Sequence, residues 1–461
     1  MNLEAVKYVY LLGAGGIGMS ALGRYFLHRG IPVAGYDRTS VSFTDQLQKE
    51  GMKLVFEDNA ELIPKELLSE ELKNHVLVIF TPAIPKDNII LNTLINKGFK
   101  LYKRAEVLGM LSKGHPTLAV AGTHGKTTTS TLVAHILKSA SLAPVAFLGG
   151  VSVNYNTNYL SGNNDSFLVA EADEYDRSFL QLHPHSSIIT STDADHLDIY
   201  GKADALLESF AQFARQTSED GVLLIKAGLK LPEDILDRAM TYHTTENADV
   251  MLSDCHLVGD KYQFSIRIGK YEMTNLELGL PGMHNVENAI AAAAICYFNG
   301  VSEEEIRKAL KSFSGVKRRF EYIIRSNDLI FIDDYAHHPE ELRACISSVK
   351  SIYPNKRVTG VFQPHLFSRT RDFYDGFATS LSMLDEVILL DIYPARELPI
   401  EGVTSAALLD KISHPAKRLV SKIELPEVLA SLKPEVLLTL GAGDIDALVE
   451  PIRERLNKMN R

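Results

Sequence analysis

The 461-residue sequence contains no tryptophan and only three cysteines, Cys255, Cys296 and Cys345. The cysteines form neither a CxxC pair nor the spacing of a zinc site, which favours buried free thiols in a reducing compartment. No apolar stretch approaches the roughly 18 residues that a membrane-spanning helix needs. These absences argue against a disulfide-rich secreted domain, a structural zinc site and a membrane protein. We expect a cytoplasmic protein with no membrane partner.

Basic side chains are also in the minority, with 48 against 58 acidic ones and a net charge of −10. This balance argues against a broad nucleic-acid-binding surface, although loops and helix N-termini bind phosphate whatever the net charge. Hydrophobic residues make up 45% and charged residues 23% of the chain, as in an ordinary globular protein. At about 150 residues per domain, the length predicts about three domains.

Short apolar runs alternate with helical stretches along the whole chain, which predicts an α/β fold with three mostly parallel sheets. We expect domains at residues 1–108, 109–315 and 316–461. The segment 248–280 differs, because its short alternating pieces predict antiparallel strands or an insertion. The expected strands are 9–12, 33–36, 76–80, 118–121, 167–170, 187–190, 329–332, 358–362, 387–390 and 436–440, and the expected helices include 19–29, 127–139 and 203–215.

A glycine turn follows the first expected strand and opens a helix, with the spacing G-x-G-x-x-G. Its residues are Gly13, Ala14, Gly15, Gly16, Ile17 and Gly18. Asp37 ends the next strand, about twenty residues on, and Thr81 and Pro82 end the third. This pattern predicts a Rossmann-like N-terminal domain that binds a diphosphate, without specifying which one. A tight turn without a ligand is the alternative.

A second phosphate-binding loop follows the strand 118–121, again before a helix. It consists of Gly122, Thr123, His124, Gly125, Lys126, Thr127, Thr128 and Thr129. Val120 stands where the usual P-loop has its first glycine, so the match is incomplete. The chemistry still fits, because backbone amides can surround phosphates, Lys126 can neutralise their charge and Thr127 can bind Mg²⁺.

Acidic and histidine side chains end the next two expected strands of this P-loop-like domain. Glu171 lies where a P-loop enzyme places its Mg²⁺ carboxylate, which favours a metal role over a solvated acidic loop. His196, within Asp195–Asp198, follows the next strand. A histidine at this edge of the sheet can ligate a metal or be structural, and the residues alone leave both interpretations open.

Three further polar clusters lie in the second half of the chain. Asn285 and Asn288 open an alanine-rich helix, where their amides can contact a purine or merely cap the helix. Asp334, His365 and Arg369 belong to clusters that end two strands of the third, Rossmann-like domain. Such clusters at the carboxyl ends of parallel strands are typical of ligand sites, although each could be a capped turn.

Taken together, these motifs resemble the Mur ligases, the ATP-dependent amide-forming family of peptidoglycan precursor synthesis. The resemblance runs from the first glycine turn to Gly441-Ala442-Gly443-Asp444. It is carried by GTHGKTTT, EADEYD, DADHLD, HNVEN, RRFE, DDYAHHPEE and FQPH with SRT, in this order. It implies a UDP-sugar on the first domain, ATP on the central one and an amino acid on the third.

The resemblance also implies a role for each motif residue. The glycine turn, Asp37, Thr81 and Pro82 would hold a UDP-sugar instead of NAD. Residues 122–128 would bind ATP, with Thr127, Glu171 and His196 on Mg²⁺. Asn285 and Asn288 would contact adenine, Arg319 the γ-phosphate, Asp334 the nucleotide, and His365 and Arg369 the amino acid. Lys126, Glu171, His196 and Arg319 would be the catalytic residues.

This chain departs from the family pattern at several places. Leu366 and Phe367 stand where Arg-Tyr is usual, so a basic substrate contact is missing or moved to Arg369 or Arg371. Ser191 replaces a common asparagine. Several family members hold a second Mg²⁺ with a CO₂-modified lysine, but the expected helix 203–215 contains no lysine.

Residues 393–400 and the glycine turn are more similar to members that join L-alanine to UDP-N-acetylmuramate than to muropeptide-recycling members. We therefore expect that reaction, with recycling as the alternative. An NAD-dependent dehydrogenase would explain the first turn but not the P-loop or Glu171. A non-catalytic nucleotide switch would leave the histidine and arginine clusters of the third domain unexplained.

Overall fold

The computed structural model describes residues 2–163, 165–193, 200, 202–245, 247–259, 261–395, 397–414 and 416–459. The chain divides into two compact units. The first comprises Met1–Ser253, Ser265–Thr274 and Asn288–Ser312, and the second comprises Asp254–Phe264, Asn275–Glu287 and Phe313–Arg461. None of the helices in the described ranges combines the length and the apolar character of a membrane span.

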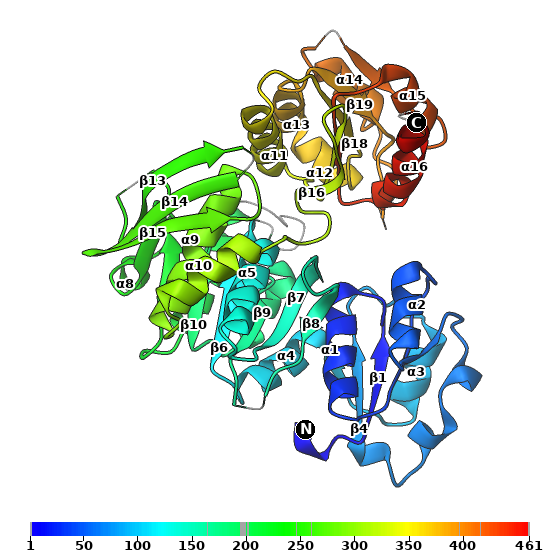
Figure 1. Ribbon diagram of the computed structural model, residues 1–461. Helices are drawn as coiled ribbons and strands as arrows, with labels where there is room; N and C mark the ends of the chain where they lie inside the picture. Colours follow the sequence, from blue (N-terminus) through cyan, green and yellow to red (C-terminus); the bar gives the residue numbers. More distant parts are fainter. Residues whose placement is uncertain are drawn as a thin grey trace. The chain divides into compact units, whose positions relative to one another are not determined.

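The N-terminal sheet belongs to the first unit and consists of five parallel strands in the order β3-β2-β1-β4-β5. The strands are β1 (Tyr8–Leu12), β2 (Val33–Tyr36), β3 (Lys53–Val55), β4 (Val76–Phe80) and β5 (Leu101–Lys103). Its helices are α1 (Ile17–His28), α2 (Ser42–Lys49), α3 (Ile89–Asn96) and α4 (Arg104–Ser112) (Figure 1). After β1 the chain adds β2 and β3 on one side of it and then returns to add β4 on the other side, so a topological switch point lies at the carboxyl end of β1.

The central sheet has ten strands in the order β15-β14-β13-β12-β11-β10-β6-β9-β7-β8. They are β6 (Thr117–Ala121), β7 (Val145–Ser152), β8 (Thr157–Leu160), β9 (Leu168–Glu171), β10 (Ser186–Ile189), β11 (Leu223–Lys226), β12 (Met240–His243), β13 (Val250–Val258), β14 (Lys261–Ile268) and β15 (Tyr271–Leu278). The helices are α5 (Lys126–Ser139), α7 (Ala203–Arg215), α8 (Glu233–Leu236), α9 (Met283–Phe298) and α10 (Glu303–Ser312). Only two residues of sequence separate β13 from β14 and β14 from β15, too few for a parallel crossover, so these neighbouring strands are antiparallel, as expected for 248–280.

The third sheet lies in the second unit, with strand order β16-β17-β21-β18-β19-β20. Only β16 pairs antiparallel with its neighbour; the other pairings are parallel. The strands are β16 (Glu321–Arg325), β17 (Ile330–Asp334), β18 (Val358–Phe362), β19 (Glu386–Leu389), β20 (Lys417–Leu419) and β21 (Val436–Leu440). The helices are α11 (Pro339–Ile352), α12 (Phe367–Asp372), α13 (Tyr374–Leu381), α14 (Ser405–Lys411), α15 (Leu425–Leu432) and α16 (Val449–Met459).

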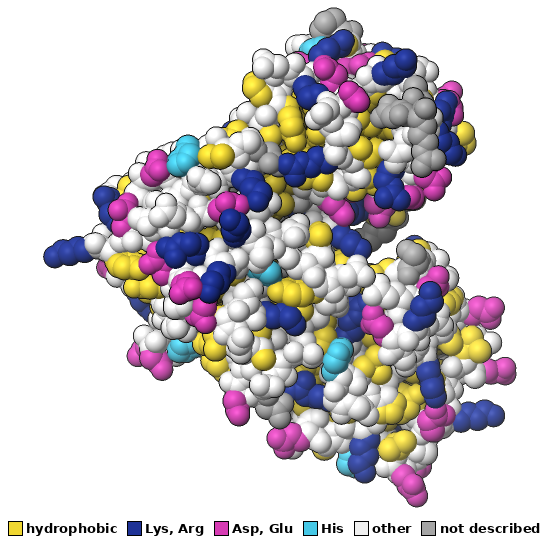
Figure 2. Space-filling view, viewed as in Figure 1, with side chains coloured by type: hydrophobic (Ala, Val, Ile, Leu, Met, Phe, Trp, Pro, Cys, Tyr) yellow, Lys and Arg dark blue, Asp and Glu magenta, His cyan; other side chains and the backbone are white. Residues whose placement is uncertain are grey.

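Apolar side chains from both faces of the inner parallel strands form the cores, which is why these strands read as continuous hydrophobic runs, whereas β13 to β15 are partly exposed. β1, β6, β17, β18 and β21 are buried along their whole length. On the face that Figure 2 shows, basic and acidic side chains are interspersed over the surface instead of gathering by sign. The three-sheet α/β architecture predicted from the sequence is confirmed.

Candidate active site

The glycine turn lies at the switch point of the N-terminal sheet. Gly13 has a φ of +89°, and a Cβ there would lie 2.4 Å from Cγ2 of Thr81. Its amide donates to the carbonyl of Tyr36 at 2.8 Å. α1 begins at Ile17, within the G-x-G-x-x-G stretch, with Gly16 as its N-cap. The turn therefore brings the N-terminus of α1 and the end of β4 to one edge of the sheet, where phosphate is favoured.

Asp37 supports this turn from the end of β2. One carboxylate oxygen accepts a hydrogen bond from the amide of Gly15 at 2.8 Å, and the other accepts from the amide of Thr39 at 3.1 Å. A Cβ on Gly15 would lie 3.0 Å from the same carboxylate. The turn and Asp37 thus come together as expected, and these bonds show that Asp37 stiffens the turn itself.

The phosphate-binding loop between β6 and α5 depends on two glycines with positive φ, +133° at Gly122 and +80° at Gly125. A Cβ on Gly122 would lie 2.0 Å from Oγ1 of Thr190, and one on Gly125 would lie 2.7 Å from Oδ1 of Asn288. Glycine is therefore required at both positions, because the backbone has a positive φ and because a side chain would have no space. The second contact places Asn288 of α9 beside the loop.

Lys126, the first residue of α5, is held by a buried carboxylate. Its Nζ donates to Gly122 O at 2.6 Å and to Glu174 Oε1 at 2.9 Å, and lies 2.8 Å from Glu174 Oε2. Burial by itself would lower the pKa of Lys126, but the carboxylates of Glu174, Glu171 and Asp173 raise it above its ordinary value. Lys126 is therefore a cation at the mouth of the loop.

Glu171, the last residue of β9, lies where the sheet leaves room for its carboxylate. A Cβ on Gly149 of the neighbouring strand β7 would lie only 1.9 Å from Oε2 of Glu171. Thr127 follows Lys126 in the first turn of α5. A hydroxyl and a carboxylate beside a phosphate loop form the oxygen donor set that Mg²⁺ prefers. The predicted ligand His196 lies outside the described residues, which hold no group of three His, Cys, Asp or Glu side chains able to bind a metal.

Ser191, after β10, fastens the loop at the position where the family usually has asparagine. Its Oγ accepts a hydrogen bond from the amide of His124 at 2.8 Å and lies 2.9 Å from the hydroxyl of Thr123. The hydroxyl of Thr190 also donates to the carbonyl of His124. The departure at Ser191 therefore keeps a polar contact with the loop.

In the second unit, Arg319 sits on a constrained loop before β16. Both of its neighbours, Arg318 and Phe320, have positive φ, at +60° and +53°, a backbone conformation that costs energy for residues other than glycine. Asp334 holds this loop, because its carboxylate accepts from the amide of Phe320 at 2.7 Å and from that of Ala336 at 2.8 Å. Burial raises the pKa of Asp334 to about 6, against the opposing effects of Arg319 and the two amides.

The Arg319 guanidinium lies 5.0 Å from the ring centroid of Tyr335 and 4.0 Å from Oε1 of Glu341. Glu341 Oε2 in turn lies 3.2 Å from Nδ1 of His337. Burial, together with the nearby Arg369 and Arg319 charges, lowers the pKa of His337 to about 4, although Glu341 opposes the shift. His337 is therefore neutral at pH 7, and its Nδ1 donates to the carbonyl of Tyr335 at 2.9 Å.

His365, which is predicted to bind the amino acid, and nearby Ser368 contact Tyr393 and Glu397 of a distant segment. The ring of His365 stacks on Tyr393 with 5.7 Å between centroids. Ser368 donates its amide to Glu397 Oε2 at 3.0 Å, and Arg369 is buried in α12. Leu366 adopts a φ of +68°. The histidine motif and this distant segment thus build one edge of the third sheet.

Asn285 makes a contact that the sequence did not indicate. Its Nδ2 donates to the carbonyl of Pro281 at 2.6 Å, at the start of α9. This bond ties the chain before α9 to its first turn, and it differs from a helix cap, in which the side chain accepts from a backbone amide. The predicted contact of Asn285 with adenine remains a prediction.

Glu174, the partner of Lys126, had no predicted role, although EADEYD contains it. Arg104 was also not predicted; its Nη1 would lie 2.6 Å from a Cβ on Gly18, and its Nη2 lies 3.4 Å from Asp173. The signal available for Glu174 was an acid three residues after a buried strand. Nothing in the sequence pattern singled out Arg104.

The structure is that of a three-domain α/β protein with separate glycine-rich turns on its first two sheets. Three family models match in turn: the Mur ligase family catalytic domain over residues 8–116, the Mur ligase middle domain over 120–296 and the Mur ligase glutamate ligase domain over 318–443. The chain belongs to the Mur ligase family, and with it to the ATP-dependent ligases.

Relatives with one shared name match the whole chain. UDP-N-acetylmuramate–L-alanine ligase of Parabacteroides distasonis is 47% identical, covering 100% of both chains. The enzyme of that name from Porphyromonas gingivalis is 48% identical over 98% of this chain and 100% of its own. The crystal structure of UDP-N-acetylmuramate–alanine ligase from Thermotoga maritima has a TM-score of 0.83 at 28% identity, covering 98% of this chain and 99% of that one. A murein peptide ligase from Psychrobacter arcticus, 22% identical with a TM-score of 0.71 over 98% of both chains, shares the fold.

Proposed function

We propose that this chain joins L-alanine to the carboxylate of UDP-N-acetylmuramate at the expense of ATP, in the cytoplasmic synthesis of a peptidoglycan precursor. The observation that carries the proposal is the phosphate-binding loop, with Lys126 held by Glu174 and Glu171 at the adjacent strand end. It lies in a chain that matches ligases of this name from end to end. NAD-dependent dehydrogenation accounts for neither feature.

In this proposal the loop residues 122–128 bind the ATP phosphates. When ATP binds, the Lys126 ammonium leaves Glu174 and pairs with phosphate oxygens. Because Lys126 is already largely buried, its positive charge is desolvated before negative charge develops on the phosphates in the transition state. Thr127 and Glu171, with His196, hold Mg²⁺. When bound, the metal neutralises phosphate charge and lets a carboxylate approach a polyphosphate. Asn288, which lies next to Gly125, and Asn285 contact the nucleotide base in this proposal.

The muramoyl carboxylate attacks the γ-phosphorus of ATP, and ADP leaves, which gives an acyl phosphate. The amine of L-alanine then attacks the acyl carbon, loses a proton, and inorganic phosphate leaves as the amide forms. Arg319 contacts the transferred phosphoryl group, and Asp334 fixes the loop that carries Arg319. His365 and Arg369 bind the amino acid.

The glycine turn binds the diphosphate of the UDP-sugar. The amides of Gly13 to Gly16 donate within the protein, so the motif offers the diphosphate the N-terminus of α1 with the amides of Ile17 and Gly18, while Asp37 keeps the turn rigid. Thr81 and Pro82 close the site from the end of β4. A diphosphate gains both hydrogen bonds and a favourable helix dipole in this position.

Phosphate release tests the proposal. The purified protein is given ATP and Mg²⁺ with UDP-N-acetylmuramate, with L-alanine, with both or with neither. Release that requires both substrates supports the proposal. Substrate-independent hydrolysis, or oxidation of NADH, would contradict it.

A panel of acceptors separates the two family activities. L-alanine, glycine, L-serine and the muropeptide tripeptide are compared at equal concentration. We expect L-alanine to give the highest kcat/KM, because the full-length relatives at 47% and 48% identity carry the L-alanine name. Preference for the tripeptide would instead favour the recycling ligase.

A further inference from the structure

Asn158 of β8 forms a buried contact with the first turn of α1, the helix that follows the glycine turn. Its Nδ2 donates to the carbonyl of Ile17 at 2.5 Å and lies 3.0 Å from the hydroxyl of Ser20. Asn158 and Ser20 have no exposed surface. β8 is the edge strand of the central sheet, so a residue of the central domain reaches the helix of the N-terminal domain.

Arg24, further along α1, completes this polar cluster. Its Nη1 donates to Oδ1 of Asn158, and its Nε and Nη2 donate to the two carboxylate oxygens of Glu50 at 2.6 and 2.8 Å. Arg24 is only 3% exposed. A buried guanidinium is tolerated because a bidentate carboxylate and an amide oxygen satisfy it.

The four side chains, called the α1 clasp below, are Ser20, Arg24, Glu50 and Asn158. Only a carboxamide suits the central position, because it must donate toward Ile17 and Ser20 while accepting from Arg24. An aspartate could accept from Arg24 but could not donate. An alanine would do neither and would leave Arg24 short of one partner in the core.

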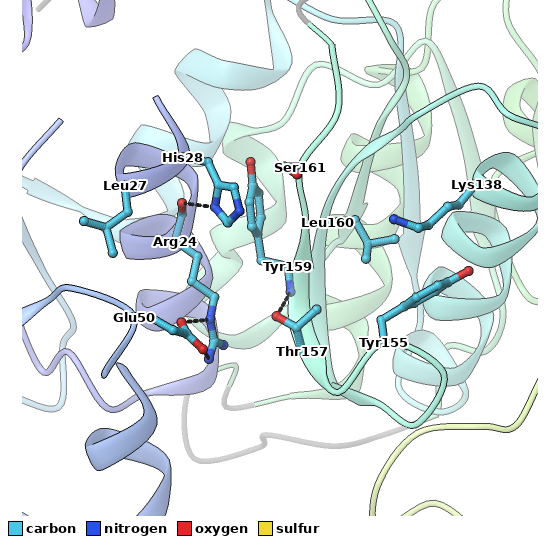
Figure 3. Close-up of a pocket in the computed structure, with 10 residues that line it drawn as sticks. All are labelled: Arg24, Leu27, His28, Glu50, Lys138, Tyr155, Thr157, Tyr159, Leu160 and Ser161. Atoms are coloured by element: carbon cyan, nitrogen blue, oxygen red, sulfur yellow. Dashed lines mark hydrogen bonds and ion pairs between the residues drawn. The ribbon is translucent and has the colours of Figure 1, made fainter. Parts of the chain in front are cut away.

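The outer side of the clasp lines a cavity of about 560 Å³. Figure 3 shows Glu50 and Arg24 at one end of it, joined by two hydrogen bonds, with Nδ1 of His28 bonded to the carbonyl of Arg24. Glu50 is 32% exposed, whereas Asn158 is fully buried. The Asn158 side chain is thus shielded from solvent, while the Glu50 end is open.

We propose that Asn158 is a positioning residue for the UDP-sugar: from the central domain, it fixes the first turn of α1 and thereby the glycine turn. This inference rests on the proposed function. Ile17 follows Gly16, the N-cap of α1, directly, so any shift of Ile17 also moves the amides that meet the diphosphate. Because those amides are already fixed before the ligand arrives, binding costs less conformational entropy.

The test compares Asn158→Asp and Asn158→Ala with Asn154→Ala. Asn154 is the matched control, because it lies in the same hairpin but donates to Ser312 O of the central domain, at 2.8 Å. Isothermal titration gives the Kd of UDP-N-acetylmuramate and, separately, that of ADP. Thermal unfolding confirms that each variant is folded, and Ser20→Ala replaces the Asn158 variants if they do not fold.

We expect both Asn158 variants to raise the Kd of UDP-N-acetylmuramate by about tenfold, roughly the effect of losing one buried hydrogen bond. The Kd of ADP should stay within twofold of wild type, and Asn154→Ala should leave both unchanged. Equal UDP-sugar affinity in wild type and the clasp variants would overturn the inference, as would a parallel loss of ADP affinity. If wild type itself binds no UDP-N-acetylmuramate, the proposed function fails instead.

Discussion

At the scale of single residues, Ser191 makes a polar contact with the phosphate-binding loop at a position where the family usually has the longer asparagine. Its hydroxyl is the acceptor for the His124 amide and a partner of Thr123, so two loop residues depend on it. It is 9% exposed, which makes an unsatisfied amide costly if the hydroxyl is removed.

Ser191→Ala should therefore raise the KM for ATP by about tenfold, since losing one buried hydrogen bond costs about 1 kcal/mol or somewhat more. The KM for UDP-N-acetylmuramate should not change. Ser191→Asn is the control, because its amide oxygen can accept from the same backbone group, and it should keep near-normal ATP affinity. An unchanged KM for ATP in Ser191→Ala would contradict the assigned role.

Asp333 gives a prediction about pH and stability. It is 1% exposed, accepts from the hydroxyl of Thr439 at 2.6 Å and lies 3.3 Å from Nε of Arg318. Burial raises its pKa from 3.8 to about 6, although Arg318 and Thr439 oppose the shift. Between these two pH values the folded protein therefore binds more protons than the unfolded chain does.

The free energy of unfolding should consequently fall as the pH rises from about 4 to about 6, by about 1.4 kcal/mol for each unit of pKa difference. The stabilisation is fully present below the unfolded pKa and is lost above the folded one. In Asp333→Asn this slope should be shallower, with Asp334 supplying what remains. Urea unfolding at several pH values measures it, and identical slopes in both proteins would contradict the assignment.

At the scale of helices and strands, local patterns predicted most elements. The predicted strands 33–36, 76–80, 358–362 and 436–440 coincide with β2, β4, β18 and β21, and helix 203–215 coincides with α7. Buried parallel strands read as continuous apolar runs, and glycines mark their ends, so both signals are local.

The contacts that could not be predicted join residues that are far apart in the sequence. Asn158 meets Ile17 across 141 positions, and Lys126 meets Glu174 across 48. No local pattern encodes such a pair, because only the strand order decides which turns become neighbours. The glycine turn and the phosphate loop were predictable, whereas the side chains that hold them in place were not.

The pairing of β7 with β9 gives a prediction at this scale. Gly149→Ala should displace the Glu171 carboxylate, because the added Cβ would lie 1.9 Å from Oε2 in its present position. We expect the Mg²⁺ concentration for half-maximal rate to rise at least several-fold, while UDP-sugar affinity stays normal. Titrating Mg²⁺ at saturating substrates measures this, and an unchanged midpoint would show that Glu171 does not serve the metal.

Helix α7 supplies another prediction. Its thirteen residues contain no lysine, and Lys202 precedes it as the exposed N-cap. No CO₂-modified lysine can therefore form on this helix as it does in several family members. Activity at slightly acidic pH should be the same in bicarbonate-depleted buffer and after bicarbonate is added back. Activation by bicarbonate would place a modified lysine elsewhere in the site.

At the scale of the whole molecule, the proposed reaction draws on residues from both units. Lys126, Glu171 and the glycine turn belong to the first unit, whereas Arg319 and His365 belong to the second. In the proposed function, residues of the first unit bind the diphosphate of the UDP-sugar, and Arg319 acts only in phosphoryl transfer. Binding and catalysis should therefore respond differently to changes in the second unit.

Arg319→Ala should lower kcat by on the order of 10²-fold, because the guanidinium acts on charge that develops only as the phosphoryl group is transferred. The KM for UDP-N-acetylmuramate should change less than about threefold, since the glycine turn is untouched. Arg325→Ala, at the exposed end of β16, is the matched control and should leave kcat near normal. Steady-state kinetics separates the outcomes. An unchanged kcat would show that Arg319 has no part in catalysis. A rise in the KM for UDP-N-acetylmuramate as large as the loss of kcat would show that the second unit also contributes to the UDP-sugar site.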